Sequence, residues 1–280
     1  MSRLLVVTAD DLGLTDGVCR AVHRGHVQGI VTATSLLAVG RAFDTAAAML
    51  RDTRTLDLGA HLALVGEDPP LLTAREVPTL VNASGAFPLS YRTVVARGVA
   101  GRIDPDDVRR ELSAQLERVV GIGLPVTHLD THQHTHLWPA VARVVTELAT
   151  ENSIPVVRLP ASHRRGPVGA GVAVLGARLR RRIAAAGLAT TADFEGLDAA
   201  GSLDLPVLER SLRGLARRAR ATAEINSHPG EADDADLQRF AWGYRWGDEL
   251  AMLTDPRART LIEEHGYRLG SFRDLQGARP

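Results

Sequence analysis

Short apolar runs alternate along the chain with longer segments in which apolar residues recur every three or four positions. This alternation is typical of parallel β-α units and not of an antiparallel sandwich. The predicted strands cover residues 4–9, 31–39, 56–64, 125–132, 155–160, 188–194, 221–229 and 267–272. The clearest predicted helices cover residues 16–28, 42–52, 105–123, 139–152, 205–219 and 255–266.

This many β-α units in 280 residues predict one α/β domain over residues 1–280, built as a TIM-like (β/α) barrel that is irregular or lacks a unit. A doubly wound open sheet is the main alternative. Two segments break the rhythm and are predicted to be loop excursions. The first, residues 65–106, is rich in Pro, Gly and turn residues, and the second, residues 161–187, includes HRRGPVGAGVAVLG.

Composition narrows the possible classes of protein. The chain has 33 basic and 33 acidic residues, so it lacks the excess of positive charge typical of nucleic-acid partners. The lone Cys19 excludes an intramolecular disulfide and is predicted to be a small core residue. The start MSRLLVVTADD lacks the regions of a signal peptide, and no apolar run is long enough to span a bilayer. These features predict a cytoplasmic protein without a membrane span.

Several catalytic classes are disfavoured by what the sequence lacks. The absence of lysine excludes Schiff-base and pyridoxal-lysine chemistry. No G-x-S-x-G nucleophile elbow is present, which disfavours a serine hydrolase. Neither a P-loop nor a G-x-G-x-x-G motif after the first strand occurs.

Polar residues gather at the carboxyl ends of the predicted strands. Asp10 and Asp11 follow the first strand, His61 lies late in the third, and His228 ends the seventh. In a barrel these strand ends open onto one face, where active sites assemble. Each residue also has a structural explanation: a helix cap for the aspartates, a buried imidazole for His61, and a turn or packing role for His228.

The stretch THLDTHQHTH, residues 127–136, follows the fourth strand. If it is extended, alternate residues share a side, so His128, Asp130, His132, His134 and His136 are predicted to form one polar row. Catalytic zinc sites use three protein ligands, and imidazole ligands are oriented by further acceptors. The economical assignment is therefore one ligand from this stretch, with the other side chains orienting it or meeting substrate.

These acids and histidines form a set that suits hydrolysis of an amide or ester. One aspartate and two histidines can hold a divalent ion that activates water, while a second aspartate and a third histidine serve as base and acid.

Six motifs carry a family resemblance: TADDLGLT, GIVTATSLL, LGAHLAL, THLDTHQHTH, NSHPGE and GYRLGSFRDL. In this order, over nearly the whole chain, they resemble the YdjC-like carbohydrate deacetylases, which include chitooligosaccharide and hopanoid-biosynthesis deacetylases. The resemblance implies a distorted (β/α) barrel related to NodB-type polysaccharide deacetylases. It also implies one divalent metal ion, magnesium or zinc, and removal of acetyl groups from N-acetylated sugars.

Motif by motif, the resemblance implies roles for individual residues. Asp11, His61 and His132 would be the metal ligands, Asp10 the base and His228 the acid. Arg158 would hold the base or steer the transition state, and Asp130, His134 and His136 would orient ligands or border the substrate.

The substrate and partners are less sharply predicted. Aromatic residues make up only 4% of the chain, so few side chains can stack on a sugar. The candidates are Trp138, Trp242, Tyr244 and Trp246, and the segment FAWGYRW, residues 240–246, serves equally well as a homodimer patch. A metal-dependent phosphoesterase or sugar isomerase on the same barrel, and a non-catalytic sugar-binding protein, are the alternative functions.

Overall fold

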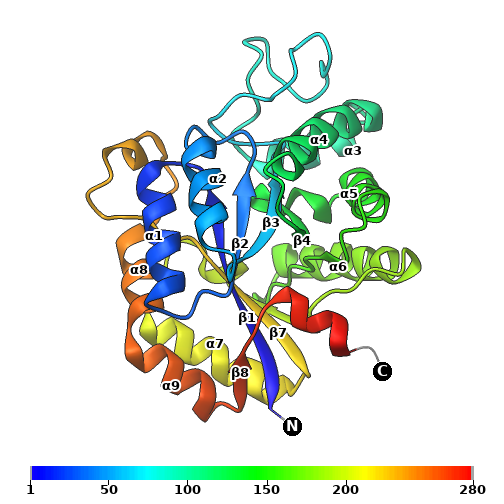
Figure 1. The fold of residues 1–280 in the computed structure, drawn as a ribbon. Helices are drawn as coiled ribbons and strands as arrows, with labels where there is room; N and C mark the ends of the chain where they lie inside the picture. The colour runs from blue at the N-terminus through cyan, green and yellow to red at the C-terminus, as the bar shows by residue number, and fades with distance from the viewer. Residues whose placement is uncertain (1, 279–280) are drawn as a thin grey trace.

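Eight parallel strands form the centre of the molecule, and helices cover their outer face (Figure 1). The computed structural model describes residues 2–278, so the outermost residues of the predicted domain 1–280 lie outside the described part. The strands are β1 (Arg3–Leu12), β2 (Ala33–Leu37), β3 (Asp57–Leu62), β4 (Val126–Thr131), β5 (Val156–Val157), β6 (Asp193–Glu195), β7 (Thr222–Ser227) and β8 (Tyr267–Leu269).

The strand order β5-β4-β3-β2-β1-β7-β6 confirms the barrel and not the doubly wound sheet. Two backbone hydrogen bonds bridge the seam near β5 and β6: Val157 N donates to the Ala189 carbonyl at 3.0 Å, and Ala189 N donates to the Pro155 carbonyl at 2.8 Å. β8 pairs with the first residues of β1, which precede the residues of β1 that pair with β2. The barrel is therefore irregular, as the pattern predicted.

The helices follow the strands in chain order. They are α1 (Asp16–Val27), α2 (Phe43–Asp52), α3 (Tyr91–Val99), α4 (Pro105–Val120), α5 (Pro139–Glu151), α6 (Pro167–Ala185), α7 (Leu205–Arg218), α8 (Trp246–Thr254) and α9 (Pro256–Glu264). Short 3-10 segments are η1 (His132–Leu137), η2 (Leu197–Ala199), η3 (Ala235–Arg239) and η4 (Phe272–Ala278). Side-chain caps start several helices; Asp104, for example, accepts a hydrogen bond from Asp106 N ahead of Pro105.

One predicted loop excursion is largely helical. Residues 167–185 form α6, and only residues 161–166 of this segment precede it as coil. The first half of α6 lacks polar residues, so its sequence shows no helical alternation of polar and apolar positions. The other excursion is mostly irregular up to residue 90, contains α3, and projects beyond the carboxyl ends of the strands (Figure 1).

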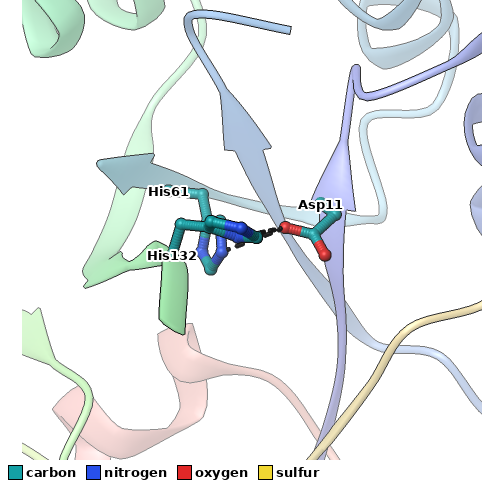
Figure 2. A group of neighbouring side chains, drawn as sticks. All are labelled: Asp11, His61 and His132. Atoms are coloured by element: carbon teal, nitrogen blue, oxygen red, sulfur yellow. Dashed lines mark hydrogen bonds and ion pairs between the residues drawn. The ribbon is translucent and has the colours of Figure 1, made fainter. Parts of the chain in front are cut away.

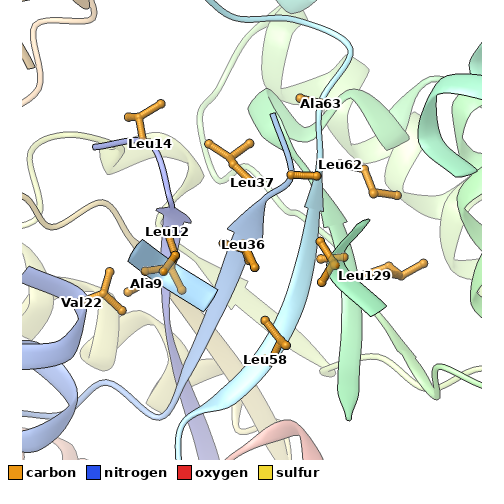
Figure 3. Close-up of a cluster of buried hydrophobic side chains, with 14 of the residues drawn as sticks. Ala9, Leu12, Leu14, Val22, Leu36, Leu37, Leu58, Leu62, Ala63 and Leu129 are labelled. Atoms are coloured by element: carbon orange, nitrogen blue, oxygen red, sulfur yellow. The ribbon is translucent and has the colours of Figure 1, made fainter. Parts of the chain in front are cut away.

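Successive residues of β1 belong to two different layers of the hydrophobic core. Leu5, Val7 and Ala9 belong to a large cluster between strands and helices, to which Leu36, Leu58 and Leu129 of the neighbouring strands contribute (Figure 3). Leu4 and Val6 belong instead to a small cluster with Ala33, Val156 and Phe272. Because successive strand residues face opposite sides, this small cluster is the inner layer of the barrel.

The inner face changes from apolar to polar toward the carboxyl ends of the strands. On β1 the inward sequence Leu4, Val6 is followed by Thr8 and Asp10, and all four are buried. On β7 the inward polar residues are Glu224 and Asn226, which stand in register with Val6 and Thr8 of β1. The apolar layer thus closes one end of the barrel, and a buried polar layer supports the other end.

Candidate active site

Asp10 and Asp11 both face the cleft at the carboxyl end of β1, although they are adjacent in a strand. The cause is local: Asp11 has a φ of 62°, in the left-handed region that non-glycine residues rarely adopt. The pairing of β1 with β2 shifts register between Ala9 and Leu12. This turn of the backbone brings two carboxylates to one side, at the cost of about 1–3 kcal/mol of strain typical of functional sites.

Three buried atoms that could bind a metal ion lie close together, one each from Asp11, His61 and His132 (Figure 2). The Asp11 Oδ1 atom lies 2.9 Å from His132 Nδ1 and 3.3 Å from His61 Nε2. Burial would raise the pKa of Asp11, but the two imidazoles hold it well below its ordinary value. The structure therefore brings together the three predicted metal ligands from β1, β3 and the start of η1.

Asp130 fixes the orientation of the His61 ring. Its Oδ1 atom lies 2.7 Å from His61 Nδ1, and its Oδ2 atom accepts a hydrogen bond of 2.7 Å from the Ser35 hydroxyl. Burial opposes protonation of His61, but Asp130 and Asp11 outweigh it and raise its pKa to about 10. The contact on Nδ1 directs Nε2 toward Asp11, an arrangement common for histidine ligands of metals.

Arg158, just after β5, holds Asp10 in a forked contact within the barrel. Nη1 and Nη2 each donate a hydrogen bond of 2.7 Å to the Asp10 carboxylate, and Nε donates one of 2.7 Å to Glu224 Oε1. Nη1 also forms an ion pair with Asp130. Burial lowers the pKa of Arg158, but the surrounding carboxylates outweigh it and raise the pKa well above its ordinary value.

A second trio of possible donors, Asp10, His61 and Asp130, also lies close together. The Arg158 guanidinium forms ion pairs with both of its carboxylates. A cation placed there would meet this positive charge, so the trio formed by Asp11, His61 and His132 is the better candidate for a metal site.

His228 stands on the other side of Asp10, at the end of β7. Its Nε2 atom lies 4.0 Å from Asp10 Oδ2, and its Nδ1 atom lies 3.9 Å from Glu249 Oε2. The backbone N of His228 donates a hydrogen bond of 2.5 Å to the same Glu249 oxygen. Glu249, on α8, therefore fixes the turn that carries the His228 ring into the cleft.

The predicted polar row of THLDTHQHTH ends after β4. Gln133 and His134 have φ values of 50° and 53°, which turn the chain out of the strand direction. His134 still lines the cleft. His136 does not border the cleft as expected, because it is fully buried, with Nδ1 2.6 Å from the Thr131 hydroxyl and Nε2 3.0 Å from the Arg158 carbonyl.

The chain is similar to known proteins over nearly its whole length. The model of the family described as YdjC-like protein matches residues 4–264. The chain belongs to this family. The carbohydrate deacetylase of Geobacillus stearothermophilus is 31% identical to this YdjC-like protein, over 98% of the chain and 99% of that relative. The chitooligosaccharide deacetylase of Enterobacter sp. (strain 638) is 30% identical, over 98% of this chain and 100% of that relative.

A solved structure supports the fold of this YdjC-like protein. A protein of Enterococcus faecalis V583, proposed in its crystal structure to be a cellobiose-phosphate cleavage protein, superposes with a TM-score of 0.81. The two chains are 23% identical, and the match covers 98% of this chain and 99% of the other. At this identity the likeness shows the fold alone.

The FAWGYRW segment of this YdjC-like protein contributes to the cleft. Trp242 and Tyr244 line the cleft, whereas Phe240 and Trp246 are buried behind them. The rings of Trp242 and His132 have centroids 5.2 Å apart. The cleft has a volume of about 630 Å³ and extends from the aspartates to α3 and α6.

Two buried glutamates at this site were missed by the sequence analysis. Glu224 contacts Arg158 from the inner face of β7, and Glu249 contacts His228 from α8. An acid within the apolar strand ATAEINS was a usable signal for Glu224. Nothing local marks Glu249, because an acid in the first turn of a helix is ordinary.

Proposed function

We propose that this YdjC-like protein is a metal-dependent deacetylase that removes an acetyl group from an N-acetylated amino sugar. The observation that carries the proposal is that Asp10 lies near both His61 of the donor trio and His228, and that all of these residues line one cleft. The names of the relatives as carbohydrate and chitooligosaccharide deacetylases support the same substrate class.

The donor trio fits a divalent ion. A carboxylate oxygen and two imidazole nitrogens are buried together, and Asp130 orients one of the imidazoles. Two nitrogen donors favour a zinc-like ion, while the family resemblance also allows magnesium. An ion held by Asp11, His61 and His132 would acidify water and polarise the acetyl carbonyl.

The protein's own groups supply the proton transfers. In this proposal, Asp10 takes a proton from a water molecule while the oxygen of that water bonds to the acetyl carbon. Arg158 and Asn226, whose amide donates to Asp10 Oδ2 at 3.1 Å, keep this carboxylate in one orientation. His228 is placed to give a proton to the nitrogen as the C–N bond breaks, so that acetate and the free amine leave.

The phosphoesterase alternative is disfavoured by Arg158. Two-metal phosphoesterases need carboxylates free to bridge or hold a second ion. Within residues 2–278, the extra carboxylates beside the donor trio are Asp10 and Asp130, and both form ion pairs with this arginine.

The proposal is tested by acetate release from N,N′-diacetylchitobiose after chelation and after return of zinc or magnesium. We expect His132→Ala to lose both bound metal and activity, and Asp10→Asn to keep the metal but lose turnover. His23→Ala, an exposed histidine on α1, is the matched control and should keep both. Full activity of the metal-free protein, without stimulation by either ion, contradicts the proposal.

A further inference from the structure

Exposed apolar side chains are concentrated around α3 and in α6, two helices that line the cleft. Among the described residues, five of the seven exposed large hydrophobic side chains lie in two segments, around α3 and in α6. These five are Leu89, Tyr91, Val99, Val168 and Val174, which are 40–76% exposed. Such clustering on a protein surface marks an interaction site, whereas single exposed apolar residues do not.

The same two segments lack acidic residues. No aspartate or glutamate occurs from residue 77 to 103 or from residue 152 to 192, although the chain as a whole is neutral. Their exposed arginines are Arg92, Arg102, Arg164, Arg165, Arg178, Arg180, Arg181 and Arg182. Within residues 2–278, only Arg164 of these forms an ion pair, with Asp198. Most of these guanidinium groups therefore have no carboxylate within ion-pair distance, although Arg178, Arg181 and Arg182 share a groove with Glu147 and Glu151 of α5.

Both segments pack on η1 and continue into the cleft. α3 and α6 both contact η1, and both line the cleft, with Tyr91 and Val94 from α3 and Val168 and Val172 from α6. Residues 167–177 of α6 contain only Pro, Val, Gly, Ala and Leu, and arginines stand on both sides of this stretch. Leu89 and Val168 are more than half exposed while they line the cleft, so they form its rim.

We propose that this face, called here the α3–α6 face, docks on the surface of an anionic lipid bilayer with the cleft mouth toward the lipid. Exposed apolar side chains can enter the boundary between headgroups and acyl chains, while arginines bind the phosphates. A nucleic acid would use the arginines but leave the aliphatic residues without a role. The docking is peripheral, because no helix of the described residues is long and apolar enough to cross a membrane. It does not depend on the proposed deacetylase activity.

The test is co-sedimentation of the full chain with vesicles. We expect binding to vesicles of equal parts phosphatidylglycerol and phosphatidylcholine, weaker binding at high salt, and little binding to phosphatidylcholine alone. Replacing Arg180, Arg181 and Arg182 by Gln should lower the partition coefficient on the order of 100-fold, since each arginine contributes about fivefold. Val168→Asp combined with Val174→Asp should weaken binding as well.

Matched controls come from other faces. Val27→Asp changes an exposed valine of α1, and Gln at Arg210, Arg217 and Arg220 removes as many exposed charges from α7 and the residues after it. Both controls should bind vesicles like the parent chain. Equal losses in controls and α3–α6 variants, or no binding to anionic vesicles, would overturn the proposal. The proposal would also be overturned if the parent chain did not bind vesicles but formed a dimer or bound an oligonucleotide, and if Val168→Asp abolished that binding. Acetate release is measured on the same protein samples. Release without vesicle binding would overturn the docking proposal alone, and vesicle binding without release would leave it standing.

Discussion

Arg158 grips Asp10 with two parallel hydrogen bonds of 2.7 Å, although 148 residues separate them in the chain. A guanidinium fork matches both oxygens of a carboxylate and fixes its plane as well as its position. Because Glu224 holds the Nε atom of the same guanidinium, Arg158 is itself held in place. The proposed base is thus oriented by an arginine that does not face the substrate cleft.

The first prediction concerns this fork. Arg158→Lys keeps a positive charge but cannot make two parallel bonds, so we expect kcat to fall on the order of 100-fold through misplacement of Asp10. Bound metal should be retained, because the donor trio is unchanged. Arg109→Lys, at a half-exposed pair with Glu151, is the control and should leave kcat unchanged. An unaltered kcat in Arg158→Lys would rule out the positioning role.

The second prediction concerns Trp242. Its ring lies in the cleft beside His132, so Trp242→Ala should raise KM for a chitobiose-like substrate roughly 5- to 10-fold through loss of stacking. Trp242→Phe keeps an aromatic face but loses the hydrogen bond of 2.9 Å to Glu67, and should raise KM less. If Trp242→Ala left KM unchanged but altered the oligomeric state seen by sedimentation, residues 240–246 would instead belong to a subunit interface.

The third prediction concerns pH and His128. Burial lowers the pKa of His128 to about 3, so the imidazole is neutral in the folded protein but gains a proton below its ordinary pKa of 6.5 when unfolded. Stability present above pH 6.5 is therefore lost as pH falls toward 3, at about 1.4 kcal/mol per pH unit for this residue.

Between about pH 6 and pH 4, we expect the unfolding free energy of His128→Gln to fall less steeply with decreasing pH than that of the parent. The difference in slope should correspond to roughly one proton fewer taken up on unfolding. Urea titrations at several pH values measure this slope. His134 and His136, whose pKa values are also lowered chiefly by burial, should keep the remaining slope above zero. His23→Gln controls for the loss of a histidine, and an equal slope in His128→Gln and the parent would refute the account.

The fourth prediction concerns Cys19, which is buried on α1, as the sequence suggested. Burial raises the pKa of its thiol to about 11. Iodoacetamide at about pH 8 should modify the native protein more than about 100-fold more slowly than the protein in urea, because the thiolate is scarce and covered. Mass spectrometry over time gives both rates. Rapid labelling of the native chain would show that α1 opens.

Much of the architecture followed from the spacing of apolar residues. All eight strands overlap the short apolar runs that predicted them, although β6 (Asp193–Glu195) shares only two residues with the run at 188–194. Such runs can be recognised because strand patterning depends only on neighbouring residues. The helices α3, α6 and α8 escaped detection. In α6 the missing signal has a physical cause, since a half made only of small and apolar residues has no polar face to mark its period.

By itself, the sequence determined the barrel, the family and the strand ends on which Asp10, Asp11, His61, His132 and His228 lie, since these depend on local pattern and motif order. Only the tertiary structure decided how these side chains meet. The removal of His136 from the cleft and the hold of Arg158 on Asp10 arise from contacts between distant segments. Such contacts follow from the closing of the barrel, which no local window of sequence contains.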